Sequence, residues 1–353
     1  MTKPLTIDAL THFADVYQAA PELAATSAGQ ELFCTLVWFD TLSTHGFARD
    51  ARLHLLLGRD SSGRPGLLPL AATHGLTSLG NYYSSLYGPV LCDPSSLTEL
   101  VDLACAHIRN DQTRWAFINL QPLAQDSAFA RQAAASFAAA GYWADHYACF
   151  GNWYLEVAGR SFAQYFSGLP PTLRHNVERG RGRLTRAGSW SISIYPSPAL
   201  DVEDGLRAYE TIYAASWKQP EPFPGFIPHL CRMAAAQGWL RLGILTLDAQ
   251  PIAAQIWIIK DGVASIYKLA YDERCGRFSP GSVLSAHMME HCIDHDQVQM
   301  VDYLTGDDAY KKDWMSHRRE RIGLIAFNPA TVRGLTAGTW HFMKKWLKRW
   351  LRR

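Results

Sequence analysis

The sequence lacks the features of a secreted or membrane-spanning protein. Its seven cysteines are odd in number and include no Cys-x-x-Cys pair, which argues against a disulfide framework and favours reduced thiols. No apolar run reaches the roughly 18 residues that span a bilayer. Residues 1–20 lack the basic start and apolar core of a signal peptide. We therefore expect a cytoplasmic protein, either free or held on the inner face of the cell membrane.

The sequence also lacks a large net charge, because 34 basic residues nearly balance 32 acidic ones. This balance argues against a dedicated nucleic-acid binder, but it hides an uneven distribution. Residues 344–353 carry six basic side chains and no acidic one, and residues 174–186 carry five Arg and one Glu. The rest of the chain holds 23 basic against 31 acidic residues, so an acidic body carries two cationic patches.

Two segments of the chain have the same pattern of apolar runs and turns. Residues 52–60 and 67–72 flank a polar turn, as do residues 241–248 and 252–259, and each pair is typical of a β-hairpin. Further on, each half has a helical stretch followed by a short strand; these are residues 96–109 with 115–120, and residues 281–295 with 299–304. The chain has 353 residues, which suits two domains. The sequence therefore predicts an α/β (α+β) protein made of two mixed-sheet units.

Near the middle of the chain, a helix and a rigid loop follow the junction between the halves at residues 149–160. Residues 161–186 have a helical pattern that starts at Ser161 and that Pro170 and Pro171 break. After a helix at residues 202–217, the loop 218–225 is rich in proline and aromatic residues. Rigid loops of this kind often shape a cleft.

The second half contains a candidate anion site. Ser279, Pro280 and Gly281 are residues that start a helix, and they follow a strand that ends near Ala270. A helix N-terminus behind a strand offers unpaired N–H groups and a favourable dipole to an anion such as a pyrophosphate. Asp302 lies in the next strand. The alternative is ordinary helix capping.

These elements carry a family resemblance. Residues 240–314 resemble the second half of GNAT-type acyltransferases of the CelD/BcsL group, which act in cellulose or exopolysaccharide biosynthesis and are distantly similar to FemAB aminoacyltransferases. The matching motifs are Gln250-Pro-Ile-Ala-Ala254, Tyr267-Lys-Leu-Ala-Tyr-Asp272, Ser279-Pro-Gly281-x-x-Leu284, Asp302-Tyr-Leu-x-Gly306 and Tyr310-Lys311-x-x-Trp314, together with the Arg-rich helix that begins at Leu173 and the segment Leu79–Ser85. The resemblance covers roughly residues 30–330.

The resemblance implies a tandem GNAT-like fold. Its first copy would be degenerate, and its second would bind acyl-CoA as a co-substrate between splayed strands, with no permanently bound cofactor. The usual Gln/Arg-x-x-Gly-x-Gly/Ala phosphate loop is absent, and residues 279–281 stand in its place. This departure leaves aminoacyl-tRNA open as the donor.

The resemblance also implies roles for individual residues. We expect Asp302 to be the general base, Tyr310 to donate a proton to the leaving thiolate and Lys311 to bind an acidic sugar or phosphate. The residues expected at the cofactor are Ser279, Pro280, Gly281 and Leu284. The residues expected at the acceptor are Arg174, Lys268, Tyr267 and Trp314. The alternatives are a structural cap or ion pair for Asp302, and core packing for Tyr310 and Trp314.

A second motif in the same helix has a different meaning. His287 and His291 with Glu290 match the His-x-x-Glu-His zinc pattern, and His295 adds a third imidazole. Because the Ser-Pro-Gly start and the following strand favour a cofactor helix, we expect no metal.

The C-terminal segment predicts an amphipathic helix. Trp340, Met343, Leu347 and Trp350 recur at helical spacing, with Lys and Arg on the other face. This pattern is typical of a helix that lies on anionic lipid. It also fits a helix docked on the protein with a solvated basic face, or one that binds nucleic acid.

The expected division is therefore 1–150 for a degenerate first domain, 151–330 for a catalytic second domain and 331–353 for the basic helix. The first hypothesis is an acyl-CoA-dependent N- or O-acyltransferase, with acetyl as the favoured group, that modifies a sugar or amino sugar in exopolysaccharide or cell-surface polysaccharide synthesis. The second is a FemAB-like aminoacyltransferase, the one case in which tRNA is a partner. The third is a non-catalytic subunit of a polysaccharide synthase.

Overall fold

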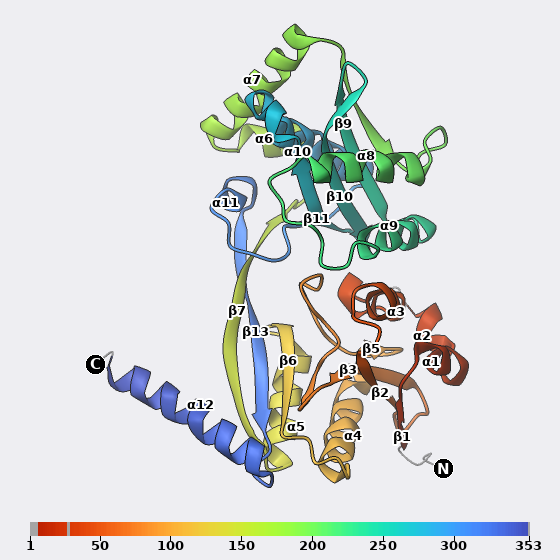
Figure 1. Ribbon diagram of the computed structural model, residues 1–353, viewed down its shortest axis with the longest axis vertical. Coiled ribbons are helices and arrows are strands. Elements are labelled where there is room, and N and C mark those ends of the chain that lie inside the picture. Colours follow the sequence, from red (N-terminus) through yellow and green to blue (C-terminus); the bar gives the residue numbers. More distant parts are fainter. Residues whose placement is uncertain (1–5, 27–28, 352–353) are drawn as a thin grey trace. The chain divides into compact units, whose positions relative to one another are not determined.

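The computed structural model describes residues 6–26 and 29–351 (Figure 1). The chain forms two compact units. Unit 1 comprises Met1–Phe150 together with Glu320–Arg353, and unit 2 comprises Gly151–Arg319. Two strands, β7 (Trp143–Glu156) and β13 (His317–Phe327), run across the boundaries between the units.

Unit 1 has a mixed sheet with helices. Its other elements in chain order are β1 (Thr6–Leu10), α1 (Phe13–Ala19), α2 (Glu22–Ala25), η1 (Leu32–Cys34), α3 (Leu36–His45), β2 (Arg52–Arg59), β3 (Pro65–Ala72), β4 (Leu76–Ser78), β5 (Val90–Leu91), η2 (Pro94–Ser96), α4 (Leu97–Asn110), β6 (Phe117–Ala124), α5 (Ala128–Ala139) and α12 (Val332–Trp350).

Unit 2 is built in the same way. Its other elements are α6 (Phe162–Ser167), α7 (Pro171–Ala187), β8 (Trp190–Tyr195), α8 (Val202–Ala214), α9 (Phe226–Ala236), β9 (Leu240–Leu247), β10 (Gln250–Lys260), β11 (Val263–Tyr271), η3 (Glu273–Phe278), α10 (Pro280–Glu290), the π-helical turn η4 (His291–His295), β12 (Met300–Asp302) and α11 (Lys311–Trp314).

The two units share one strand topology. The strand order is β1-β2-β3-β4-β6-β13 in unit 1 and β8-β9-β10-β11-β12-β7 in unit 2. In both, the fourth and fifth strands run parallel and the other neighbours run antiparallel. The crossover between the parallel strands contains a helix, α4 in unit 1 and α10 in unit 2. The mixed α/β fold in two units is thereby confirmed.

The last strand of each unit pairs with a strand that is distant in the sequence. β7 follows unit 1 in sequence but pairs with β12 of unit 2. β13 follows unit 2 in sequence but pairs with β6 of unit 1 through Arg321–Phe327. Residues 320–330, expected in the second domain, therefore group with unit 1 because their backbone hydrogen bonds go to β6. Residues 331–353, expected as a separate segment, also belong to unit 1.

Local sequence explains the elements near the site. Ser161 starts α6 with a capping box in which its hydroxyl accepts from Gln164 N–H and the Gln164 side chain accepts from Ser161 N–H. Pro170 then separates α6 from α7, which begins at Pro171. Buried apolar residues from α7, β10, β11 and α10 form the core of unit 2. This core fixes the position of α10 against the sheet.

Within residues 6–26 and 29–351, the structure has no helix that is long and apolar enough to cross a membrane.

Candidate active site

The parallel strands β11 and β12 separate part of the way along their length. They pair over three residues, from Val263 with Met300 to Ser265 with Asp302. β12 ends there, whereas β11 continues to Tyr271. On its other side β11 has a register shift against β10 between Ile256 and Trp257. The strands therefore splay, and the space beyond Asp302 opens beside the N-terminus of α10.

A cavity of about 360 Å³ occupies this region of unit 2. Its wall comes from the end of β11, the first turns of α10, the segment after β12, and α11. The lining residues are Trp217, Gln255, Leu269, Tyr271, Gly276, Ser279, Pro280, Gly281, Ser282, Ser285, Tyr303, Tyr310 and Trp314. The wall is predominantly apolar and aromatic, as is usual for small-molecule sites.

The first turn of α10 faces this cavity. Ser279 takes a left-handed conformation with φ of 50° and turns the chain into the helix, which begins at Pro280. The Ser279 side chain makes no capping hydrogen bond, and the N–H groups of Gly281 and Ser282 have no acceptor within the helix. An added Cβ at Gly281 would meet the Tyr271 ring at 3.4 Å. Three of the four residues expected at the cofactor, Ser279, Pro280 and Gly281, thus lie together at a helix N-terminus that lines the cavity.

A buried amide holds α10 against the sheet. The Gln255 side chain from β10 donates to Ser285 Oγ at 2.7 Å and to the Gly281 carbonyl oxygen at 3.1 Å. Its own oxygen accepts from the Trp257 indole at 2.9 Å. This network fixes the first turns of the helix and therefore the direction of its N–H groups.

Three aromatic residues from the segment between β12 and the end of α11 also line the cavity. Tyr303 is buried and contacts the half-exposed Tyr310 ring edge to face, with centroids 5.7 Å apart. Burial, aided by Asp308, raises the pKa of Tyr310 to about 12, so this phenol is protonated at neutral pH. Trp314 is buried, and its carbonyl oxygen accepts from the Tyr165 hydroxyl at 2.8 Å. Tyr310 and Trp314, which the sequence analysis expects at the active site, both line the cavity.

Asp302 has surroundings other than those expected of a base. One carboxylate oxygen accepts from Asn152 Nδ2 and from Leu304 N–H, both at 2.6 Å. The other oxygen accepts from the Arg319 guanidinium. The side chain is buried and is not part of the cavity wall. Because the carboxylate is held by donors from β7, β13 and its own loop, its geometry is that of a positioning residue at the end of β12.

Lys311 is also buried outside the cavity wall. Its ammonium donates to the carbonyl oxygen of Thr305 at 2.5 Å, contacts that of Gly306 at 3.3 Å, and pairs with Asp308 at 3.3 Å. Burial lowers its pKa. Lys311 therefore fastens the segment that carries Tyr303 next to the cavity.

The acceptor residues expected from sequence are dispersed. Lys268 precedes Leu269 on β11, so it points to the opposite face of the strand from the cavity, where its ammonium lies 2.7 Å from Glu221 Oε1. Tyr267 falls at the register shift between β10 and β11. Arg174 donates to the Leu169 carbonyl oxygen at 3.2 Å. Leu284, expected at the cofactor, is fully buried in the core instead.

Several wall residues were not predicted from the sequence. They are Trp217, Gln255, Leu269, Tyr271, Gly276, Ser282, Ser285 and Tyr303. The alternation of Leu269 and Tyr271 with buried Ala270 on β11 was the available signal, since alternate residues of a strand share a face.

The histidine motif is interrupted. α10 ends at Glu290, and a π-helical turn holds His291 and His295, whose rings lie 5.2 Å apart. His291 Nε2 lies 3.6 Å from Asp296. Among the residues that the structure describes, no group of three or more His, Cys, Asp or Glu side chains is arranged to hold a metal ion.

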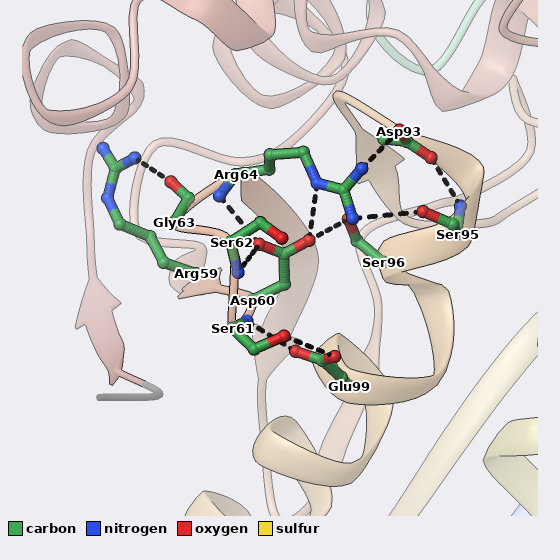
Figure 2. A network of polar contacts seen from close by, with 10 residues as sticks. All are labelled: Arg59, Asp60, Ser61, Ser62, Gly63, Arg64, Asp93, Ser95, Ser96 and Glu99. Carbon is green, nitrogen blue, oxygen red and sulfur yellow. Dashed lines mark hydrogen bonds and ion pairs between the residues drawn. The ribbon is translucent and has the colours of Figure 1, made fainter. Parts of the chain in front are cut away.

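The corresponding helix of unit 1 has a different N-terminus (Figure 2). Asp93 precedes the first turn and accepts from Ser95 N–H at 2.8 Å. Buried Asp60 accepts from the Ser96 hydroxyl at 2.6 Å, and Glu99 accepts from Ser61 N–H at 2.6 Å. Three carboxylates of the protein thus surround the start of α4, whereas the start of α10 borders a cavity.

The sequence and the fold were compared with those of known proteins. Residues 172–312 match the family model described as an acetyltransferase (GNAT) domain. No curated protein matches the chain.

Solved structures show the same fold at low sequence identity. One is the C-terminal domain (DUF2156) of a "Putative Lysylphosphatidylglycerol Synthetase" from Agrobacterium fabrum, at 13% identity and TM-score 0.58, covering 92% of this chain and 95% of that one. Another is FemX, at 11% identity and TM-score 0.57, with 90% and 96% covered. A conserved protein from Bacteroides thetaiotaomicron VPI-5482 has 9% identity and TM-score 0.55, with 92% and 100% covered.

The matched residues 172–312 include every residue of the cavity wall except Trp314. The GNAT family model and the two-unit α/β fold together support an acyltransferase enzyme.

Proposed function

We propose that the protein is an acyl-CoA-dependent N- or O-acyltransferase that modifies a sugar or amino sugar in exopolysaccharide or cell-surface polysaccharide synthesis. The observation that carries the proposal is the first turn of α10, which borders an aromatic cavity between splayed strands. A helix N-terminus binds pyrophosphate through backbone N–H groups, and an apolar cavity suits the acyl arm. Acetyl-CoA is the donor that we favour, from the GNAT family match.

The residues at this end of unit 2 fit such a donor. Gly281 and Ser282 offer first-turn N–H groups. Arg277, at the end of η3, adds positive charge two residues before Ser279, and its carbonyl oxygen accepts from Arg183 of α7 at 2.6 Å. The Arg-rich α7 is thereby attached next to the proposed phosphate site.

Unit 1 is proposed to be the degenerate copy. Asp60, Asp93 and Glu99 at the start of α4 keep a negative balance where a pyrophosphate would bind, although Arg64 pairs with both aspartates. Like charges at close distance are unfavourable, so we expect one acyl-CoA site per chain, in unit 2.

The chemistry assigned to the site is transfer through a tetrahedral intermediate. The acceptor nitrogen or oxygen attacks the thioester carbonyl carbon, and the carbon–sulfur bond breaks. Tyr310, protonated at neutral pH, donates a proton to the leaving thiolate. Asp302 and Lys311 hold the two ends of the segment that carries Tyr303 and so keep the wall in place. The acceptor's proton leaves to solvent, and the Tyr310 phenolate takes up a proton from solvent, so that the enzyme returns to its starting state.

One lysine supports an acidic acceptor. Lys218 follows the cavity residue Trp217, and its ammonium lies 5.8 Å from the centroid of the Trp217 ring. Burial, with the nearby charges of Lys268 and Lys311, lowers the pKa of Lys218. Because Lys268 pairs with Glu221 and Lys311 with Asp308, Lys218 is the cation that suits a sugar bearing phosphate, as in a nucleotide sugar or a lipid-linked pyrophosphate.

Two substitutions of Ser282 test whether the N-terminus of α10 binds the donor. Ser282→Asp places a carboxylate in the first turn of α10, where the helix dipole favours it, so the fold is retained. The same charge repels a pyrophosphate, and we expect acetyl-CoA binding to weaken at least tenfold by calorimetry. Ser282→Ala is the matched control and should bind within about threefold of the original chain. Equal binding by both variants would remove α10 from the donor site.

A second candidate is aminoacyl transfer from tRNA. The similarity of fold to FemX and to a lysylphosphatidylglycerol synthetase domain favours it. A thermal shift with acetyl-CoA, with aminoacyl-tRNA and with buffer separates the possibilities, because a ligand of the native state raises the melting temperature. A shift with tRNA alone supports the second candidate, and no shift with either supports a non-catalytic subunit.

A further inference from the structure

The C-terminal helix α12 attaches to unit 1 through one narrow stripe. Gly334 and Gly338 are its buried residues. An added Cβ at Gly338 would lie 2.9 Å from the Trp143 ring, so only glycine permits this approach. Further along, His341 Nε2 pairs with Asp145 at 2.8 Å, and Lys345 pairs with the same carboxylate. The stripe recurs every three to four residues, as one face of a helix does.

The face opposite this stripe is apolar and exposed. Its large side chains, with their exposed fractions, are Leu335 43%, Trp340 55%, Met343 42%, Trp346 64%, Leu347 41%, Trp350 66% and Leu351 74%. A surface helix of a soluble protein normally turns its apolar face to the core and its polar face to water. α12 does the reverse, because small residues and ion pairs face the protein while tryptophans face outward.

Positive charge borders this apolar face. Lys344 and Lys348 lie along one edge, and Lys344 Nζ lies 4.6 Å from the centroid of the Trp340 ring. Arg349 lies on the other side of the helix. Residues 331–353 contain no Asp or Glu. In Figure 1 the C-terminal part of α12 extends away from β13 and the rest of unit 1.

We propose that the outward face of α12 inserts into the headgroup region of an anionic lipid bilayer. Tryptophan prefers the membrane interface, and each Lys or Arg near an anionic surface contributes to binding. A helix of 19 residues with this charge lies in the plane of the interface rather than across the bilayer. A second copy of the chain is the less favourable occupant, because pairing two such helices brings together like charges with no acid between them.

This inference goes beyond the proposed reaction and would place the enzyme where membrane-linked acceptors are found. It does not depend on the donor or on the chemistry in unit 2.

The experiment measures co-sedimentation of the full-length protein with vesicles. The vesicles contain phosphatidylcholine alone, or phosphatidylcholine with 30% phosphatidylglycerol (an assay choice on the order of natural anionic content). We expect binding to the anionic vesicles that weakens with salt, and at least tenfold weaker binding to the neutral ones.

Two variants test the two parts of the face. Trp346→Ser with Trp350→Ser removes outward apolar area, and Lys344→Glu with Lys348→Glu reverses the bordering charge; each should weaken binding at least tenfold. The matched controls are Tyr82→Ser, an aromatic residue 68% exposed elsewhere in unit 1, and the exposed Arg52→Glu. Both controls should bind as the original chain does.

Three outcomes would overturn the proposal. These are equal binding to neutral and anionic vesicles, unchanged binding by the double tryptophan variant, and a dimer in solution that this variant converts to a monomer. Acetyl-CoA binding by the same variants, measured by calorimetry without vesicles, should stay unchanged. A failure of the membrane inference is thus distinguishable from a failure of the proposed acyl transfer.

Discussion

Lys268 Nζ of β11 lies 2.7 Å from Glu221 Oε1 of the proline-rich loop, and both side chains are less than one-tenth exposed. The second oxygen of Glu221 is buried, and no hydrogen-bond donor among the residues that the structure describes reaches it. The pair therefore joins the loop that follows α8 to the strand that lines the cavity. Because both side chains are buried, water does not solvate the two charges, and each compensates the other.

The first prediction concerns this pair. Lys268→Met should lower the free energy of unfolding by about 3–5 kcal/mol, because it leaves a buried carboxylate without a counter-ion. Adding Glu221→Gln should restore part of that loss, giving a coupling energy of about 1–3 kcal/mol in urea denaturation. Arg207→Gln breaks the exposed pair with Asp204 and should cost less than about 1 kcal/mol. Additive losses for the first two substitutions would contradict the prediction.

The second prediction concerns Asp60 in the hairpin turn of unit 1 (Figure 2). Burial acts to raise its pKa, but hydrogen bonds from Ser96, Arg64 and Ser62 outweigh burial and lower the pKa to about 2. A carboxylate with a lowered pKa in the folded state stabilises the fold above its unfolded pKa of about 3.8. This stabilisation is lost as the pH falls from about 4 towards 2.

Thermal unfolding at pH 5 and pH 3 checks this. Asp60→Asn should lower the melting temperature at pH 5 and should show a smaller further loss at pH 3 than the original chain does. An equal acid-induced loss in both proteins would show that Asp60 does not titrate in this range.

The third prediction concerns Tyr310. Tyr310→Phe should lower kcat about 100-fold, since a positioned general acid typically contributes at least this factor, while KM for acyl-CoA changes little. Because the pKa of Tyr310 is raised to about 12, its loss of a proton should not reduce kcat of the original enzyme below about pH 10. Tyr82→Phe, at an exposed position of unit 1, is the control. A kcat retained in Tyr310→Phe would assign the proton to another donor.

The fourth prediction concerns two glycines of α7. A Cβ at Gly180 would lie 2.6 Å from the Phe278 carbonyl oxygen and 2.7 Å from Val283, whereas a Cβ at Gly182 would meet one flexible Arg186 atom at 3.9 Å. Gly180→Ala should therefore cost about 1–3 kcal/mol of stability and weaken acetyl-CoA binding by shifting the start of α10. Gly182→Ala should stabilise the helix by about 0.5–1 kcal/mol. Equal effects of the two substitutions would mean that α7 does not set the position of α10.

Local sequence determined most of the elements. The turn at residues 61–66 and the apolar runs around it predicted the β2–β3 hairpin, and Ser161 predicted the start of α6. Ser279, Pro280 and Gly281 predicted the start of α10 for the same reason, since capping and backbone restriction act over a few residues. Tyr310 and Trp314 were placed at the site through their family resemblance, and the fold brought both to the cavity.

Tertiary structure alone decided the rest. Asp302 is held by Asn152 and Arg319, which are 167 residues apart in the sequence, and no local pattern encodes that meeting. Gln255 and Ser285 gained a role in the cavity wall from the packing of α10 on β10. The exchange of β7 and β13 set the unit boundaries through backbone pairing. The α12 tryptophans point outward because the face that carries Gly334 and Gly338 packs on unit 1. The periodicity of the sequence defines the faces of a helix, but packing selects the face that is buried.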